Sequence, residues 1–571
     1  MQKWVKRLAV LLLSVMALAG FVYLYLEPAK PPASQAFINA QVITMDANNS
    51  LAEAVYIEGE RIIAVGSRAE IEHLITPTTL IHDLHGKTLV PGFVDAHSHF
   101  PGSGMSLFMA DLRSPPVGNI TSVVTLLAAL KTRASATPKG EWVNGFGYDN
   151  LMLTERRHPS IAELDAAVPD HPVFIMHVSG HLAVANSAAL AAVDISAKTP
   201  DPAGGHYGRD DEGSLTGLLE ENAATALQRK TFDIGVLGFL QMTRQATEEY
   251  LHAGVTTAQS GTVSREFTQG LGFAKQLNLV PMRLELWPKF DEFGLDLLEG
   301  VDDPQNYNTD TLHIGAVKIV ADGSIQGFTG YLSQPYHTPF GDDHTYRGYP
   351  RMPFTELAAW IARYHAAGYQ LAIHGNGDAA IEDIINAFEM AQKATPRADP
   401  RMILIHAQML RDDQLDRLTA LGITPSFFSA HTYYWGDQHR DVTMGPDRAA
   451  NISPAQSALQ RHVRFSSHLD TPIVPMSPLL SVWSCVTRLS ASGNIIGPAQ
   501  RIDVLSALRS VTIDAAWQIF RDKDLGSIEP GKLADLVVLD QDPLGDPLAI
   551  KDIPVNLTMI GGVSHYQRHA D

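Results

Sequence analysis

The chain has 571 residues, of which 45% are hydrophobic and 18% charged, so it can bury a large core and is not disordered. Its formal net charge of -19 argues against a nucleic-acid partner, because phosphate backbones are bound by basic surfaces. The single cysteine, Cys485, cannot form a disulfide within the chain and lies in an apolar stretch, which predicts a buried side chain.

The first residues predict export or membrane anchoring. Lys3, Lys6 and Arg7 precede an apolar run over residues 8–26, an order typical of a signal segment whose basic end stays in the cytoplasm. The run is long enough to span a bilayer. We therefore expect residues 1–34 to contain a single-pass membrane anchor and a linker, with a cleaved signal peptide as the alternative. The rest of the chain would then be periplasmic or extracellular.

Both ends of the remaining chain predict short strands. Residues 35–90 contain apolar runs separated by turn residues, and a similar pattern returns over residues 521–571 around Gly561 and Gly562. A long α/β segment separates the two. We therefore expect one small β-sandwich domain that is assembled from both ends of the chain.

Residues 91–520 predict a (β/α)8 barrel, also called a TIM barrel, within the α/β class. Eight short apolar runs occur there, most of them followed by a polar or glycine-containing loop and a helical pattern. The gap after the first run, about residues 100–240, is far longer than the others and predicts an insertion beside the barrel mouth. The runs cover residues 90–94, 255–258, 282–286, 314–320, 370–373, 402–405, 423–427 and 463–466.

Five of the eight runs lead into a side chain that can bind a metal ion. The active sites of such barrels lie at the C-terminal ends of the strands. His97 and His99 are two residues apart and would point to the same face of an extended segment. Each candidate alone has a simpler structural explanation, such as core hydrogen bonding for a histidine, but their common position favours a metal centre. The candidate ligands are His97, His99, Lys318, His374, His406 and Asp470.

Several motifs resemble those of the amidohydrolase superfamily, in particular its family 3, the YtcJ-like branch. Residues 90–99 (VPGFVDAHSH) are similar to the opening motif of the superfamily. Residues 318–324 (KIVADGS), 372–378 (AIHGNGD), 470–472 (DTP) and 526–537 (GSIEPGKLADLV) resemble segments of family 3. The resemblance covers nearly the whole chain after the N-terminal segment.

The resemblance implies a centre with two divalent metal ions, zinc by default. His97, His99 and Asp470 would hold the more buried ion, and His374 and His406 the more exposed one. A small molecule is the expected partner, and a homodimer remains an option.

Lys318 would bridge both ions as a carbamate formed with carbon dioxide. This role fits a buried lysine, because an ammonium group cannot bind a cation whereas a carbamate is an anionic oxygen donor. A hydroxide that bridges the ions would attack the substrate carbonyl, and Asp470 would transfer the proton to the leaving group.

The expected activity is hydrolysis of a carbon–nitrogen bond other than a peptide bond, in an amide. A deaminase or a lactone or ester hydrolase on the same metal site is the first alternative, because fold and metal alone do not decide the substrate. A membrane-tethered binding protein without turnover is the alternative from another class. A missing ligand would favour it, and all six candidate ligands are present.

His181, Tyr148 and Trp483 are the candidate substrate-binding residues. The first two lie in segments of the insertion that resemble pocket-lining segments of the family, whereas core packing is the simpler role for Trp483. Family members often carry a basic residue shortly after the Asp-Gly-Ser that follows Lys318. Residues 325–330 contain none, which favours a neutral or apolar substrate.

Overall fold

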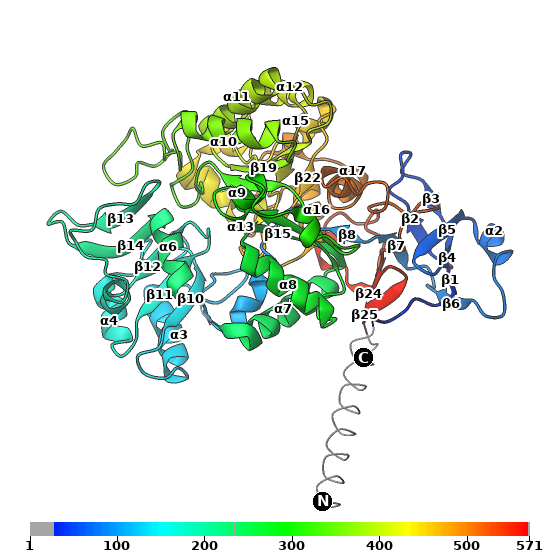
Figure 1. Ribbon diagram of the computed structural model, residues 1–571, viewed down its shortest axis with the longest axis horizontal. Coiled ribbons are helices and arrows are strands. Elements are labelled where there is room, and N and C mark those ends of the chain that lie inside the picture. Colours follow the sequence, from blue (N-terminus) through cyan, green and yellow to red (C-terminus); the bar gives the residue numbers. More distant parts are fainter. Residues whose placement is uncertain (1–27, 232–233, 569–571) are drawn as a thin grey trace, which may run out of the picture.

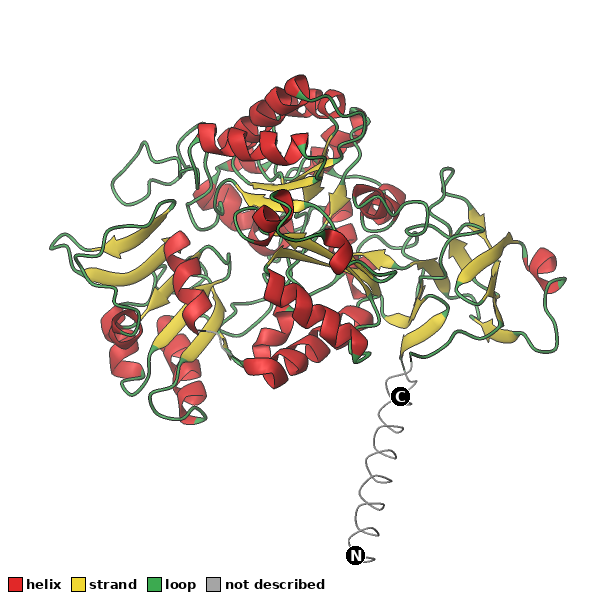
Figure 2. Cartoon of the chain, in the orientation of Figure 1, coloured by secondary structure: helices red, strands yellow, loops and turns green. Residues whose placement is uncertain are grey.

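The described part of the chain forms five β-sheets with helices packed against them (Figure 1, Figure 2). The computed structural model describes residues 28–231 and 234–568. Strands from both ends of the chain lie at one end of the molecule, two parallel sheets lie in the middle, and the insertion lies at the opposite end (Figure 1). The predicted α/β class is confirmed.

The predicted membrane location requires correction. The apolar run over residues 8–26 lies outside the described residues. Within residues 28–231 and 234–568, no helix is both long and apolar enough to cross a bilayer. The predictions of a membrane location and of a membrane as partner are therefore not retained.

Two parallel sheets occupy the middle of the molecule, and each of the eight predicted runs overlaps one of their strands. The first sheet, in the order β17-β16-β15-β8, contains β8 (Phe93–Val94), β15 (Val255–Val263), β16 (Arg283–Pro288) and β17 (Leu312–Ile314). The second runs from β18 to β22 in chain order. Its strands are β18 (Val317–Val320), β19 (Leu371–Gly375), β20 (Met402–His406), β21 (Ile423–Phe427) and β22 (Ser466–Ser467).

Helices follow most of these strands, and the strands are buried on both faces, as is typical of parallel sheets. Local sequence fixes the helix ends. The Ser264 side chain accepts a hydrogen bond from the Phe267 N–H at the start of α8, and Gly422 ends α12 with a φ of 70°. The helices are α7 (Gly235–His252), α8 (Arg265–Gln276), α9 (Phe293–Leu298), α10 (Phe354–Ala366), α11 (Asp378–Ala394), α12 (Asp412–Leu421), α13 (His431–Gln438), α14 (Pro446–Ala449), α15 (Ala455–Gln460), α16 (Pro478–Thr487), α17 (Val504–Ser510) and α18 (Ile513–Gln518).

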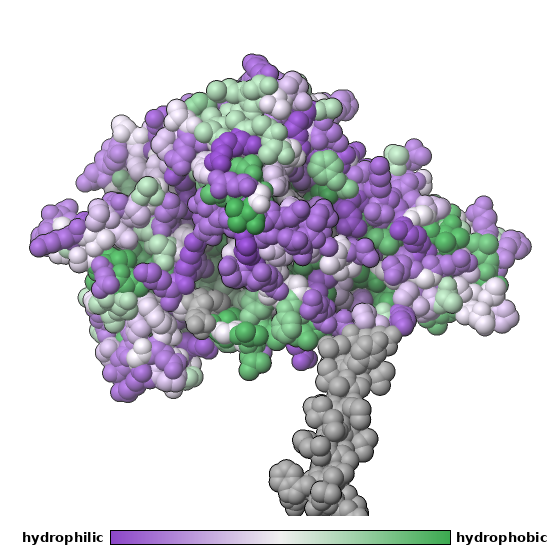
Figure 3. All heavy atoms as spheres, in the orientation of Figure 1, coloured by the Kyte–Doolittle hydropathy of each residue, from purple (hydrophilic) through white to green (hydrophobic). Residues whose placement is uncertain are grey.

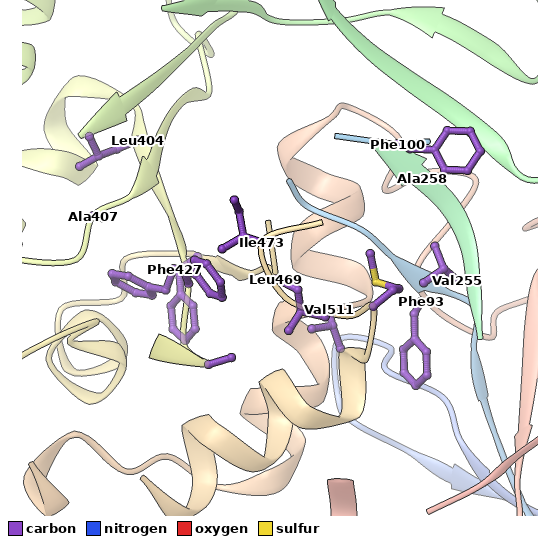
Figure 4. Close-up of a cluster of buried hydrophobic side chains, with 14 of the residues drawn as sticks. Phe93, Phe100, Val255, Ala258, Leu404, Ala407, Phe427, Leu469, Ile473 and Val511 are labelled. Atoms are coloured by element: carbon purple, nitrogen blue, oxygen red, sulfur yellow. The ribbon is translucent and has the colours of Figure 1, made fainter. Parts of the chain in front are cut away.

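The two middle sheets share one apolar core. Figure 4 shows Phe93 and Val255 from the first sheet and Phe427 from the second as members of the same buried cluster, with Leu469 from the loop after β22 between them. Because these side chains are packed, the strand ends that carry the candidate ligands are held in fixed positions.

The insertion has a six-stranded sheet of its own, in the order β13-β14-β12-β11-β10-β9. It lies at the end of the molecule away from the strands of residues 34–91 (Figure 1). Its strands are β9 (Ala110–Asp111), β10 (Val143–Tyr148), β11 (Val173–His177), β12 (Leu182–Ala185), β13 (Gly205–Arg209) and β14 (Leu215–Glu221). The helices are α3 (Val123–Ser135), α4 (Ile161–Ala167), α5 (Ser187–Ala191) and α6 (Asn222–Thr231).

Strands from the two ends of the chain pair with one another. β7 (Thr88–Pro91) pairs antiparallel with β23 (Leu536–Leu539) in a sheet of order β25-β24-β23-β7-β2-β3. A second sheet has the order β5-β4-β1-β6. The remaining elements are β1 (Ser34–Ile38), β2 (Gln41–Ile43), β3 (Leu51–Ala52), β4 (Ala54–Glu58), β5 (Arg61–Gly66), α2 (Arg68–Glu72), β6 (Leu80–Asp83), β24 (Val555–Ile560) and β25 (Val563–Gln567). Hydrophilic residues dominate the face of the molecule seen in Figure 3, in keeping with the composition.

A buried ion pair joins the middle sheets to the strands from the chain ends. Arg283, at the start of β16, donates from Nε and Nη2 to the two carboxylate oxygens of Asp535 at 2.9 and 3.1 Å. Both side chains are buried. We expect Arg283→Met to lower the free energy of unfolding by about 3–5 kcal/mol, because it leaves the Asp535 charge buried without a partner.

Urea unfolding of this variant and of a matched control tests the prediction. Arg244 and Glu248 form an exposed ion pair on α7, so Arg244→Met should change the free energy of unfolding by less than about 0.5 kcal/mol. Equal destabilisation by the two substitutions would contradict a structural role for the buried pair.

Candidate metal centre

Three of the six predicted ligands lie within reach of a single metal ion. His97 and His99 follow β8, Asp470 follows β22, and one ligand atom from each lies within 4.8 Å of the others. Oδ1 of Asp470 is 3.4 Å from Nε2 of His97 and 3.2 Å from Nε2 of His99. The backbone N–H of Asp470 donates to the His97 carbonyl at 3.2 Å, which joins the two loops. Two imidazoles and a carboxylate are a donor set that suits zinc.

Lys318 lies on β18 next to this group. Its Nζ is 3.2 Å from Nε2 of His97, and the residue is only 2% exposed. Burial lowers the pKa of Lys318 to about 7, because the ammonium form loses its hydration. A large share of the amine is therefore neutral near neutral pH.

His374 and His406, the last two predicted ligands, lie at the ends of β19 and β20. Their ring centroids are 4.6 Å apart, and that of His406 is 5.7 Å from the His97 ring. Burial holds the pKa of His97, His374 and His406 well below the ordinary histidine value. All three are therefore neutral, which is the form that binds metal ions.

The second ring nitrogen of each of these histidines has a partner that fixes the ring. Nδ1 of His374 lies 3.1 Å from Oδ1 of Asp322, and Nδ1 of His406 lies 3.0 Å from Nε2 of His468. Nδ1 of His97 lies 2.9 Å from Oε1 of Gln259. Supporting contacts of this kind orient metal ligands in proteins.

These supporting residues were not among the predicted site residues. Two of them carry a signal in the sequence, namely a position close to a candidate ligand: Asp322 follows Lys318 by four residues, and His468 precedes Asp470 by two. Gln259 carries none, because only the pairing of β15 with β8 brings it to His97.

Asp322 should be needed for metal binding. Its carboxylate accepts hydrogen bonds from the backbone N–H groups of Tyr331, Asn376 and Gly377 and holds His374. We expect Asp322→Ala to weaken metal binding about 10-fold to 100-fold, because the His374 ring is no longer held. Titration of the purified protein with zinc measures the affinity.

A carboxylate on the loop that follows β18 provides the control for this titration. Asp343 is exposed and contacts Thr345 within its own turn, so Asp343→Ala should leave the zinc affinity unchanged. Unchanged affinity in the Asp322 variant as well would show that His374 does not depend on this contact.

The surroundings of Asp470 also fit a cation bound within the cluster. Oδ1 of Asp470 is buried and has no hydrogen-bond partner within the described structure, although it lies beside Nε2 of two histidines. A buried carboxylate oxygen without a donor is costly. A cation between this oxygen and the imidazole nitrogens would remove that cost.

The three candidate substrate-binding residues lie in different surroundings. The His181 ring is 5.1 Å from that of His374, beside the cluster. Tyr148 is fully buried, and its hydroxyl lies 3.0 Å from Nδ1 of His158. The indole N–H of Trp483 donates to the Leu548 carbonyl at 3.1 Å. The structure therefore brings His181 to the cluster, whereas the contacts of Tyr148 and Trp483 belong to the protein core.

Comparison with known proteins identifies the class to which this fold and donor set belong. The sequence matches the "Amidohydrolase family" over residues 81–566. The chain therefore belongs to this family and is a metal-dependent hydrolase of carbon–nitrogen bonds. The predicted family and enzyme class are confirmed, and a non-catalytic binding protein is not favoured.

Individual relatives match nearly the whole chain. An N-substituted formamide deformylase from Arthrobacter pascens is 31% identical over 543 residues, covering 93% of this chain and 98% of the relative. The putative amidohydrolase YtcJ from Bacillus subtilis is 29% identical, covering 92% and 98%. An uncharacterized metal-dependent hydrolase from Pyrococcus horikoshii, solved as a crystal structure, aligns with a TM-score of 0.71 at 26% identity, covering 90% and 99%.

Proposed function

We propose that the protein hydrolyses the carbon–nitrogen bond of a small neutral amide and that N-substituted formamides are the first class to test. The observation that carries the proposal is the position of six potential ligands at strand ends around one buried cluster. The relative from Arthrobacter pascens, which is a formamide deformylase by name, supports the choice of substrate.

Apolar side chains near the cluster support a neutral substrate. A pocket lined in part by Val178, Trp435, Ile473 and Val474 borders the loop that follows Asp470. Its charged lining residues, Arg113 and Asp149, have partners within the protein: Arg113 pairs with Asp111, and Asp149 accepts a hydrogen bond from the Trp435 indole. Such walls favour an apolar substituent on the substrate.

Two divalent metal ions, with zinc as the first choice, would serve as cofactors. His97, His99 and Asp470 would hold one ion, and His374 and His406 the other. When bound, such ions lower the pKa of a water molecule and polarise the substrate carbonyl.

Lys318, as a carbamate, would contribute an oxygen donor to each ion. Its burial and its closeness to His97 support this role, and the neutral share of its amine is the form that reacts with carbon dioxide. Carbamate formation would therefore replace an ammonium group, which repels cations, with an anionic ligand.

Asp470 would move the proton during the reaction. Its Oδ1 lies between His97 and His99, and its Oδ2 is 3.9 Å from Nε2 of His406, so the carboxylate faces both parts of the cluster. From this position it would accept the proton of the attacking water and deliver it to the leaving nitrogen.

We further propose that the two middle sheets form one (β/α)8 barrel within residues 91–520. β17 and β18 are separated by two residues, and Lys289 pairs with Lys318 beyond the end of β16. The Asp470-to-His97 hydrogen bond joins the loop after the last strand to the loop after the first. These contacts support a closed ring of strands.

The strands of residues 35–90 and 521–571 would form a β-sandwich. Support comes from an apolar cluster that contains Phe37 from one sheet and Leu89 and Leu536 from the other.

Hydrolysis assays test the proposed activity. Protein loaded with zinc in the presence of bicarbonate should release formate from N-substituted formamides. Lactones and amidines are assayed in parallel. Turnover of these compounds without turnover of any amide would contradict the proposal.

A further inference from the structure

A carboxylate from the insertion holds the histidine that lies beside the ligand His374. Glu221 is the last residue of β14, and its side chain is 0% exposed. Its Oε2 lies 2.8 Å from Nδ1 of His181, and its backbone N–H donates to the His181 carbonyl at 2.7 Å. Glu221 has a φ of 51°, a value that residues other than glycine rarely adopt. Glu221 therefore contacts both the ring and the backbone carbonyl of His181, and these two contacts fix the orientation of the His181 imidazole.

The surroundings of Glu221 keep its carboxylate charged and in place. Burial alone would raise the pKa of Glu221, but the hydrogen bond from His181 and the charge of Arg351 hold this pKa below its ordinary value. Nη1 of Arg351 is 3.2 Å from Oε2 of Glu221. A Cβ atom at Gly323, the residue after Asp322, would clash with Oε1 of Glu221. The loop that supports His374 is thus built to receive this side chain.

The contact with Glu221 determines which nitrogen of His181 carries the proton. A carboxylate only accepts hydrogen bonds, so Nδ1 of His181 is the donor, and Nε2 of the neutral ring is an acceptor. Among the described residues, none forms a hydrogen bond with Nε2 of His181, and the side chain is 15% exposed beside His374.

We infer that Nε2 of His181 accepts a hydrogen bond from the N–H of the substrate amide and that Glu221 is the positioning residue for this contact. The inference rests on the proposed function and narrows its substrate class. Primary and secondary amides carry such an N–H. N,N-disubstituted amides and esters carry no such N–H. They would place an alkyl group or an oxygen lone pair against Nε2 of His181, which is itself a hydrogen-bond acceptor.

A matched set of compounds tests the selectivity: N-benzylformamide, N-benzyl-N-methylformamide and benzyl formate. His181→Ala should lower kcat/KM for N-benzylformamide about 10-fold to 100-fold, the effect of losing one hydrogen bond in a buried site. The same substitution should change kcat/KM for the other two compounds about 3-fold at most, because they make no such bond. Equal losses for all three compounds would overturn the inference.

Glu221→Gln and one control variant complete the comparison. Glu221→Gln should reduce the preference for N-benzylformamide, since an amide does not fix the proton on Nδ1 of His181. His206 also places Nδ1 against a carboxylate, that of Asp201, but it is an exposed residue of β13 in the insertion. His206→Ala should leave the preference unchanged, and an equal effect of the two substitutions would contradict the positioning role.

The tautomer of His181 is measured without metal and without turnover. In protein with ¹⁵N-labelled histidine, the signals lost in His181→Ala identify the ring, and we expect a proton on Nδ1. A proton on Nε2 in the unmodified protein would overturn the inference.

Binding separates failure of the inference from failure of the proposed function. If metal-loaded protein hydrolyses no amide, the proposed function fails. Calorimetry with the metal-loaded Asp470→Asn variant then compares the affinities for the same three compounds. Tighter binding of N-benzylformamide, by about 10-fold, would uphold the contact with His181, and equal affinities would overturn it.

Discussion

Asp470→Asn is expected to lower kcat for amide hydrolysis about 1000-fold while most of the metal stays bound. Asparagine keeps an oxygen that can face His97 and His99, so the cavity for the ion is retained. It is not basic, and it cannot accept the proton that the reaction must pass to the leaving nitrogen. The rate of hydrolysis and the metal content of the same preparation are measured together.

A second buried aspartate serves as the control for this substitution. Asp514 is paired with Arg464 and Arg509 outside the cluster, and burial raises its pKa to about 6. Asp514→Asn should retain hydrolysis even where it lowers stability. Full activity of the Asp470 variant would exclude the proton-transfer role, whatever its metal content.

Lys318→Ala is expected to empty the metal centre and to abolish hydrolysis. The substitution removes the only predicted ligand that would contribute to both ions, and it leaves the neighbouring histidines without a shared anionic donor. Short carboxylic acids such as formate or acetate should restore part of the activity, because their carboxylate can occupy the space of the carbamate. Metal content and activity are measured with and without these acids.

Lys275 provides a matched control for this experiment. It is partly buried, and this burial lowers its pKa to about 7, but its Nζ donates to the Val280 and Met282 carbonyls outside the cluster. Lys275→Ala should keep the metal. Unchanged metal content in the Lys318 variant would contradict the carbamate bridge.

The candidate ligands could be predicted from the sequence because most of them lie in or beside a strand with a clear apolar pattern. The apolar residues of a buried parallel strand show where the strand lies in the sequence. A polar residue in or at the end of such a strand then stands out, as Lys318 does in β18 and His374 at the end of β19. The residues that hold the histidines of the site were harder to predict. Glu221 and Gln259 reach the cluster only through tertiary contacts between segments distant in sequence.

Similarity of a short segment to pocket-lining segments does not show which of its side chains face the pocket, and Tyr148 is an example. The end of β10 does reach the pocket, but successive side chains of a strand point in opposite directions. Tyr148 therefore enters the core of the insertion, and its neighbour Asp149 lines the pocket. Alternation fixes which residues share a face, and only the packed structure shows which face meets the pocket.

The separate sheet of the insertion was not predicted. Its strands do not pair in chain order: β12 lies between β11 and β14, and β13 is at the edge. β9 has two residues and β12 has four, too few for a periodic pattern to be recognised.

The metal content of each chain is the decisive test of the proposed centre with two divalent ions. The protein is purified without chelators and without added metal, and its divalent ions are counted by elemental analysis. We expect close to two ions per chain. Absence of bound metal, even after incubation with zinc and bicarbonate, would contradict it.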